Sequence, residues 1–204
     1  MSTDIQIMEK PDWVSWEDIR QCLYEAHSVN RAKGINMFLY QASPDKLREY
    51  IGENGVMLVA LDGNKIVGVC GMCEKKDKQW FTKGAYAQLS LGGILPECSG
   101  HGVFRRFIQI LERIAEERSY FAVLSSTHEK NKRRIDISKS NGYKLVGYTA
   151  VGDHYNVLMA KWPEGSPYSE PYRRFRVGLS WITSRTKSLL RPLYHMVKNR
   201  MHRH

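Results

Sequence analysis

The most informative segment of this chain is Leu91-Gly92-Gly93-Ile94-Leu95-Pro96-Glu97-Cys98-Ser99-Gly100-His101-Gly102-Val103-Phe104-Arg105-Arg106. It predicts an apolar strand that ends at Pro96, a short Ser/Gly turn, and a helix that begins at Val103. Glycines at 100 and 102 allow a sharp turn and a close approach of the backbone to a ligand. The helix directs unpaired N–H groups and its positive dipole end at the same place. The segment therefore predicts a cradle for an anion such as a pyrophosphate, the alternative being an ordinary strand–helix loop.

A second motif begins at Asn131 and ends at Ser140-Asn141-Gly142-Tyr143, where Asn-Gly is a natural helix end. The two motifs together resemble the GNAT superfamily of acyl-CoA N-acyltransferases. In that superfamily a strand ends near V-x-P, a Q/R-x-x-G-x-G/A loop follows, and an Asn and a Y-x-x-x-G-F segment come later. The corresponding segments here are Ile94-Leu95-Pro96, Glu97-Cys98-Ser99-Gly100-His101-Gly102, Asn131 and Ser138-Lys139-Ser140-Asn141-Gly142-Tyr143. The resemblance extends over residues 4–162.

The resemblance implies an α/β fold with a mixed, mostly antiparallel sheet of about six to seven strands, flanked by about four helices. It also implies acetyl-CoA or another acyl-CoA as co-substrate. The backbone amides that it assigns to the pyrophosphate are those of Ser99, Gly100, His101, Gly102 and Val103. A backbone N–H of Ile94 or Leu95 would polarise the thioester carbonyl, and such preorganised donors are often the largest catalytic contribution. The resemblance implies that Asn131 contacts the pantetheine arm or positions a water. The other interpretation of Asn131 is a plain helix N-cap.

Two residues depart from the family pattern. Glu97 stands where the family usually has Gln or Arg, which is compatible with phosphate binding if its side chain points away while backbone amides bind. Ser138 stands where many members carry a tyrosine that protonates the leaving thiolate. A serine hydroxyl is a poorer acid than a phenol, whose reference pKa is about 10. Ser138 is nevertheless the candidate acid.

The general base has no single candidate on the strand before the glycine turn. Alternation places Tyr86, Gln88 and Ser90 on one face of that strand, and none is a good base at neutral pH. His154, on the closing hairpin, and His27, on the first helix, titrate in the right range. We take His154 as the second candidate catalytic residue, although each histidine taken singly is also explained as a surface residue.

Apolar spacing and turn residues predict the order of elements. Ser15-Trp16-Glu17-Asp18 resembles a capping box, and Ser43-Pro44 combines a cap with a first-turn proline. Strands are predicted at 4–9, 56–61, 65–72, 86–95, 120–124, 143–151 and 155–162, and helices at 15–30, from Ser43, at 103–119 and at 131–140. Ser125-Ser126-Thr127-His128 follow the fifth strand.

Charge divides the chain unevenly. The chain has 204 residues and a net charge of +10. Residues 164–204 hold nine Lys/Arg against Glu164 and Glu170, which gives +7 and leaves +3 for the rest. We therefore predict an acyltransferase domain over residues 1–162 and a basic amphipathic helical tail over 163–204, with 163–167 as linker. The apolar residues at helical spacing in this tail are Val177, Leu179, Ile182, Leu189, Leu193 and Val197, interrupted by Pro192.

Such a tail has three interpretations. A basic amphipathic segment can lie on an anionic bilayer, or it can pack its apolar side on the domain or on a second subunit, as in a homodimer. Nucleic acid binding is the weakest interpretation, because no recognised motif accompanies the charge. If the tail is an anchor, its removal from Ser166 onward leaves the core folded and free of vesicles.

Cysteine usage and the N-terminus bear on compartment. The first residues show neither a basic start nor an apolar run, and no segment reaches the apolar length that spans a bilayer. Four cysteines without a secretory signal favour free thiols in a reducing cytoplasm, at the cytoplasmic membrane face if the tail binds lipid. Cys70-Gly71-Met72-Cys73 imitates half of a zinc site. However, strand residues three apart point to opposite faces, so we expect no metal.

The sequence therefore predicts an N-acyltransferase whose acceptor is a small-molecule or peptide amine. The alternative is a catalytically idle acyl-CoA-binding or scaffolding domain that docks through its basic tail.

Overall fold

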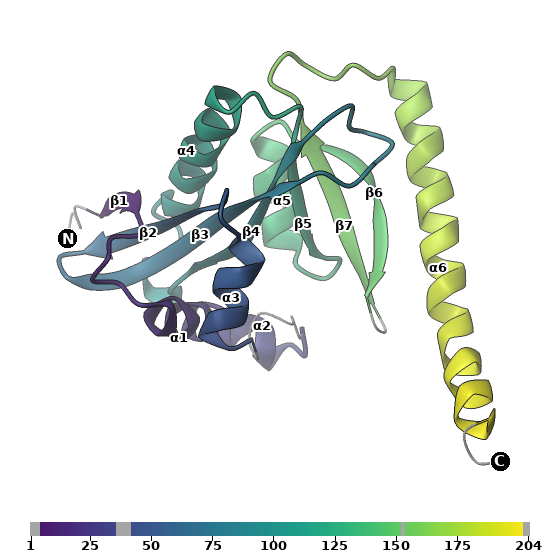
Figure 1. Cartoon of the computed structure of the whole chain (residues 1–204), viewed down its shortest axis with the longest axis horizontal. Coiled ribbons are helices and arrows are strands. Elements are labelled where there is room, and N and C mark those ends of the chain that lie inside the picture. Colours follow the sequence, from purple (N-terminus) through teal and green to yellow (C-terminus); the bar gives the residue numbers. More distant parts are fainter. Residues whose placement is uncertain (1–4, 36–41, 152–153, 202–204) are drawn as a thin grey trace. The chain divides into compact units, whose positions relative to one another are not determined.

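The computed structural model of the chain describes residues 5–35, 42–151 and 154–201, of which 187–201 are described by their backbone alone. Within these residues there are seven strands and six α-helices (Figure 1). The elements are β1 (Gln6–Glu9), α1 (Trp16–Ala26), α2 (Ser28–Ala32), α3 (Pro44–Ile51), β2 (Val56–Asp62), β3 (Lys65–Lys75), β4 (Tyr86–Ile94), the 3₁₀ turn η2 (Pro96–Cys98), α4 (Val103–Glu117), β5 (Val123–His128), α5 (Lys132–Ser140), β6 (Lys144–Val151), β7 (His154–Lys161) and α6 (Glu170–Met201).

The chain folds into two compact units, residues 1–125 and 126–204. The strand order is β1-β2-β3-β4-β5-β7-β6, and β5 passes from the first unit into the second. In the first unit β1 to β4 are paired antiparallel, and β4 then pairs parallel with the start of β5. In the second unit β6 and β7 form an antiparallel hairpin. This mixed α/β sheet confirms the predicted fold class.

The helices of the first unit cover both faces of its sheet (Figure 1). A Cβ added at Gly68 would lie 3.4 Å from Phe107 of α4, whereas one added at Gly71 would lie 2.5 Å from Ile51 of α3. The apolar stripe of α4 is the centre of the layer on its face. Its buried residues are Val103, Phe107, Ile108, Leu111 and Ala115.

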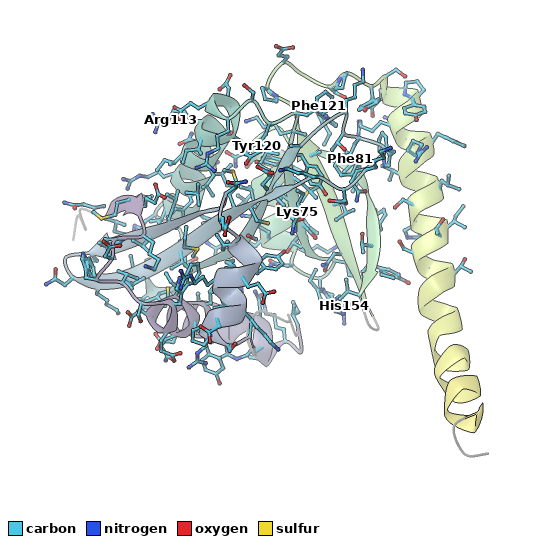
Figure 2. All side chains as sticks on the ribbon, viewed as in Figure 1. Lys75, Phe81, Arg113, Tyr120, Phe121 and His154 are labelled. Atoms are coloured by element: carbon cyan, nitrogen blue, oxygen red, sulfur yellow. The ribbon has the colours of Figure 1, made fainter. Side chains whose placement is uncertain are left out.

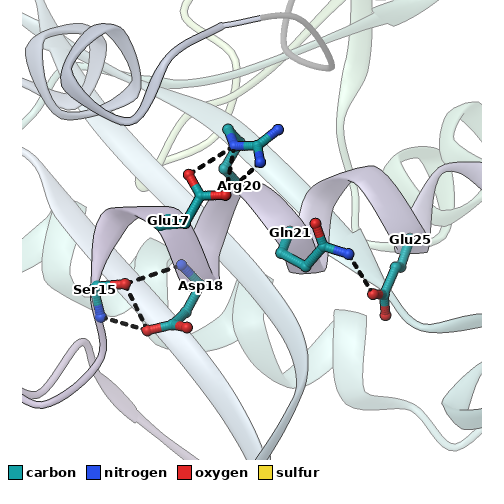
Figure 3. Close-up of polar contacts among 6 residues, drawn as sticks. All are labelled: Ser15, Glu17, Asp18, Arg20, Gln21 and Glu25. Carbon is teal, nitrogen blue, oxygen red and sulfur yellow. Dashed lines mark hydrogen bonds and ion pairs between the residues drawn. The ribbon is translucent and has the colours of Figure 1, made fainter.

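The first helix begins where the sequence predicts. Ser15 is the N-cap of α1, and its Oγ accepts a hydrogen bond from the Asp18 N–H at 3.1 Å while the Asp18 carboxylate accepts from the Ser15 N–H at 2.8 Å (Figure 3). This reciprocal capping box gives hydrogen-bond partners to the N–H groups of Ser15 and Asp18, which have no partner within the helix. The predicted 15–30 helix does not continue unbroken, because His27 ends α1 and a short α2 follows.

In the second unit, α6 runs along β6 at the end of the strand order (Figure 1). The Ser180 hydroxyl accepts from the Tyr148 N–H at 2.8 Å and donates to the Tyr148 carbonyl at 3.0 Å, and the Ser184 hydroxyl donates to the same carbonyl at 2.9 Å. Arg173 donates to the Leu145 carbonyl at 3.0 Å. These side chains cover the exposed backbone of an edge strand.

Three predicted boundaries differ from the structure. Ser125–His128 belong to β5, although the predicted strand ends at Leu124, because these side chains are largely buried and fit a strand. The strand is therefore later than the predicted 120–124. The tail helix starts at Glu170 and runs through Pro192 instead of being interrupted there. Val177 is half-buried on the side of α6 that carries Arg173, Ser180 and Ser184, so it does not belong with Leu179 and Ile182.

Candidate functional site

The glycine turn before α4 presents open space to a ligand. Gly100 and Gly102 have φ values of +100° and +75°, and a Cβ added at either would meet nothing within 4 Å. Gly102 is the N-cap of α4, and because glycine has no side chain, the first N–H groups of the helix receive no hydrogen bond from a capping side chain. The first N–H groups of a helix lack intrahelical partners. From Gly100 to the first turn of α4, open space and helix N-terminal N–H groups thus occur together, which is an arrangement that favours anions in proteins.

The 3₁₀ turn η2 narrows the set of available amides. The Cys98 N–H donates to the Leu95 carbonyl at 3.0 Å, and the Ser99 N–H donates to the Pro96 carbonyl at 3.2 Å. Ser99, one of the five residues predicted to hold a pyrophosphate, therefore has its N–H engaged within the turn. The amides of Gly100, His101, Gly102 and Val103 are those left to the ligand.

Charges around the turn favour an anion. The first turn of α4 holds no acidic residue, and it includes the exposed Arg105 and Arg106. The Glu97 carboxylate lies 3.1 Å from Lys65 Nζ at the start of β3. A hydrogen bond from its own backbone and the Lys65 ammonium lower the pKa of Glu97. The carboxylate that departs from the family pattern is therefore paired with a lysine at the surface.

Strand β4 is bulged immediately before this turn. Leu91 has a positive φ of 47°, and the register of β3 with β4 shifts between Val69 and Gly71. A bulge inserts an extra residue and bends the strand away from regular pairing. This bulge is absent from the predicted elements, although the adjacent Gly92-Gly93 pair is a sequence signal for such sites.

Beyond the bulge, β4 offers one backbone N–H to a ligand. The pairs between β4 and β5 cover Ala87–Leu89 only, so in the described residues the edge of β4 from Ser90 to Ile94 has no ladder partner on that side. The Leu95 N–H donates to the Val67 carbonyl at 2.9 Å. Because bonded and non-bonded pairs alternate in an antiparallel ladder, Ile94, opposite Gly68, points its N–H away from β3. Of the two predicted donors, Ile94 is the available one.

His27 supports the bulge from the other face. Its Nε2 lies 3.0 Å from the Gly92 carbonyl, and its Nδ1 lies 3.0 Å from Asn30 Nδ2. With Asn30 Nδ2 donating to Nδ1, the Nε2–H of His27 donates to the Gly92 carbonyl. A Cβ on Gly93 would lie 2.8 Å from Ala26, so α1 requires a glycine there. His27 is 6% exposed, which corrects its interpretation as a surface residue. Its spacing of four from the buried Leu23 was the signal for this.

The polar residues on the inner face of β4 offer no base at neutral pH. Gln88 donates to the Tyr50 hydroxyl at 3.2 Å, and burial, with a smaller contribution from Cys73, raises the pKa of Tyr50 to about 12. Burial also raises the pKa of the Cys73 thiol. Burial and the hydrogen bond to Asp77, at 2.8 Å, raise the pKa of Tyr86. A proton acceptor must therefore come from elsewhere.

Three predicted site residues lie in the second unit. Asn131 is the N-cap of α5, and its Oδ1 accepts from the Arg134 N–H at 3.3 Å, which is the structural role foreseen for it. Ser138 is 0% exposed. This burial argues against direct contact between its hydroxyl and a bound thioester.

His154 begins β7 (Figure 2) and stacks on His128. The ring centroids are 4.2 Å apart and the planes are inclined by 20°. Nδ1 of His128 accepts from the Lys130 N–H at 3.0 Å, which fixes the ring that His154 contacts. Sequence reasoning missed His128, because nothing in the pattern at 125–128 sets this residue apart from its neighbours.

The cysteine pair of the C-x-x-C segment is buried in β3. Cys70 lies 4.0 Å from the Ser90 carbonyl and Cys73 lies 3.7 Å from the Gln88 carbonyl, so both thiols face the backbone of β4. Among the residues that the structure describes, no group of three or more His, Cys, Asp or Glu is arranged to hold a metal ion.

Comparisons with solved structures identify the fold. An acetyltransferase of the GNAT family from Streptococcus agalactiae 2603 matches with a TM-score of 0.62 and 17% identity over 78% of this chain and 95% of its own. The ribosomal-protein-S18-alanine N-acetyltransferase from Escherichia coli matches with a TM-score of 0.58 and 14% identity, over 81% and 97%. An aminoglycoside 6'-N-acetyltransferase complexed with coenzyme A matches with a TM-score of 0.55 and 14% identity, over 77% and 96%. No protein-family model and no curated protein matches the chain.

Proposed function

From the GNAT N-acetyltransferase fold of this chain, we propose that it is an acyl-CoA-dependent N-acyltransferase that transfers an acetyl or other short acyl group to a primary amine. The observation that carries the proposal is the open turn at Gly100 and Gly102 in front of α4. The turn follows a bulged strand whose Ile94 N–H is available. Both features lie in the first unit, and both are built from backbone.

The residues present fit coenzyme A as a co-substrate. The amides of Gly100 to Val103 would bind the pyrophosphate, because positive φ values turn the backbone toward it and no Cβ occupies the space. Arg105 and the α4 dipole would add attraction. The ion pair with Lys65 keeps the Glu97 charge from opposing this.

The proposed chemistry is a direct transfer. Acyl-CoA supplies an activated thioester, so that attack by the amine forms a C–N bond as the C–S bond breaks, with one proton leaving the nitrogen and one reaching the sulfur. The Ile94 N–H would donate to the carbonyl oxygen, where negative charge develops. His27 would hold this segment in place through the Gly92 carbonyl. His154, whose ring stacks on His128 in the second unit, is the general base that we propose from the sequence.

The proton for the sulfur would come from solvent. Ser138, which stands in the place of the family's tyrosine, has no exposed surface. The same observation favours the second candidate, an acyl-CoA-binding domain without turnover. The acceptor is an amine of small-molecule or peptide type. The solved relatives, by their names, include enzymes for an aminoglycoside and for a protein alanine.

Thiol release from acetyl-CoA tests the proposal, with amino sugars, small amines, lysine peptides and free peptide N-termini as acceptors. We expect turnover with at least one of these classes. Ile94→Pro removes the outward N–H and should lower kcat by about 10²–10³-fold with CoA affinity unchanged. Ile94→Ala, which keeps the N–H, is the control for the side chain. Binding of CoA without turnover on any acceptor would favour the idle domain.

A further inference from the structure

Helix α6 carries an apolar stripe on the side opposite its contacts with β6. Phe175, Leu179 and Ile182 are spaced by four and three residues, and they are 66%, 48% and 58% exposed. At about 100° per residue, this spacing places them on one side of the helix. The docked side chains Ser180 and Ser184 lie on the other side. Single exposed apolar residues are ordinary, but an aligned set marks an interaction surface.

The apolar spacing of the sequence continues after these described side chains. Leu189, Leu193 and Val197 follow Ile182 at helical spacing, within the range of α6. A helix of 32 residues is about 48 Å long at ~1.5 Å per residue. In the part of the chain that the structure describes, no helix is both long enough and apolar enough to span a membrane. The stripe therefore suits a helix that lies on a surface.

The basic charge of the tail indicates which kind of partner the apolar stripe contacts. Residues 164–204 hold nine Lys/Arg and two acidic residues. One of those acids, Glu170, is already paired with Arg173 and Arg174. Two copies of so basic a segment would repel each other, which disfavours a helix–helix dimer across the stripe. A nucleic acid would match the charge but not an apolar stripe. A surface that is both anionic and apolar beneath its charges meets both requirements.

An aromatic residue marks the border of the stripe. Trp181 is exposed, and the Arg185 guanidinium lies 4.9 Å from its ring centroid. A ring with an apolar body and a polar edge, next to a cation, is typical of side chains at a lipid–water interface. Arg174, on the same flank by helical spacing, is exposed as well.

We propose that α6 docks this protein on an anionic lipid surface through the Phe175–Leu179–Ile182 stripe and the basic residues beside it. The docked face and the lipid face are different sides of one helix. The contact with β6 and the membrane contact are therefore compatible, and the two leading interpretations of the tail do not exclude each other. This proposal stands independently of the acyl-transfer chemistry.

Co-sedimentation of the full chain with vesicles tests this. Vesicles of phosphatidylcholine with 30% phosphatidylserine, an illustrative composition in the range of about −30 to −50 mV surface potentials, should bind the protein at 0.1 M salt. Pure phosphatidylcholine should not. Raising salt to about 0.5 M should release it, because screening shortens the Debye length well below ~10 Å.

Two matched double variants distinguish binding through the α6 stripe from nonspecific adsorption through other exposed apolar residues. Phe175→Ser/Ile182→Ser should weaken binding to the anionic vesicles by about tenfold or more, because two exposed apolar side chains are lost. Trp13→Ser/Val29→Ser changes two side chains of similar exposure, 60% and 50%, in the first unit, and should leave vesicle binding unchanged. Circular dichroism checks that both variants keep their helix content.

Three outcomes would overturn the proposal. The first is no vesicle binding, with a dimer in light scattering that the α6 variant disrupts, which would assign the stripe to a second copy. The second is vesicle binding that the α6 variant leaves intact. The third is tighter retention on RNA than on anionic vesicles, unaffected by the α6 variant, which would assign the charge to nucleic acid.

Discussion

The apolar stripe of α4 is buried against the sheet of its unit, whereas the stripe of α6 faces away from the strand that the helix covers. Both helices show apolar residues at helical spacing in the sequence. The α4 stripe is the aliphatic and aromatic core under β3 and β4. Helix α6 instead docks through serine hydroxyls and an arginine, because its partner is the polar edge of β6. The spacing of apolar residues thus predicts that a helix has an apolar face. Whether that face is buried depends on the element against which the helix packs.

The largest expected effect comes from truncating the same side chain in the two helices. Phe107 is 0% exposed and Phe175 is 66% exposed. Phe107→Ala should lower the free energy of unfolding by about 3–5 kcal/mol, because it leaves a cavity in the core. Phe175→Ala should change it by less than about 0.5 kcal/mol. Urea denaturation of both variants measures this, and equal losses would show that α6 buries its stripe after all.

A smaller effect is expected where α6 meets β6. Ser180→Ala removes both hydrogen bonds to Tyr148 and should destabilise the chain by about 1–3 kcal/mol, because an edge N–H is left without its partner. Thr183→Ala is the control, since among the described residues that hydroxyl donates to the Leu179 carbonyl of its own helix and not to β6. Chemical denaturation compares the two. If the control were as destabilising as Ser180→Ala, the polar docking of α6 would contribute nothing.

The last effect, which is absent at neutral pH, is a pH dependence from the buried face of α1, a face that is covered as that of α4 is. Burial raises the pKa of Cys22 from 9.0 to about 12, with a smaller contribution from Glu25. The folded state therefore holds this proton more tightly than the unfolded state. Stability is complete below pH 9 and falls as pH rises from 9 toward 12. Denaturation midpoints should decline over this range, and less steeply in Cys22→Ala than in Cys98→Ala, whose thiol is only half-buried. Parallel slopes would remove Cys22 as the cause.

The fold and the glycine turn could be predicted from sequence because they rest on local signals. The capping box at Ser15, the Asn-Gly helix end at Asn141 and the α4 stripe each depend on residues a few positions apart. The two glycines before α4 likewise predict a sharp turn from their residue type alone, and both have positive φ in the structure. The order of helices and strands along the chain followed from these local signals and from the family resemblance.

The rest depended on contacts distant in the chain. Whether Ile94 or Leu95 offers its N–H is decided by Val67, on another strand. The role of His27 is decided by the carbonyl of Gly92, and that of His154 by a ring stacked from β5. Burial of Ser138 is likewise a property of packing. The spacing of residues within one segment does not predict contacts between residues that are distant in the sequence.

The central claim, that the glycine turn before α4 binds coenzyme A, is tested most directly by calorimetric titration of CoA into two matched variants. Gly102→Leu and Gly52→Leu both place a side chain at a positive φ, +75° and +74°, and Gly52, which caps α3, is the more strained position because its ψ is 173°. We expect wild-type affinity for Gly52→Leu and a loss of at least about 100-fold for Gly102→Leu, since the Gly102→Leu side chain fills the space for the pyrophosphate. Unchanged CoA affinity in a folded Gly102→Leu protein would contradict it.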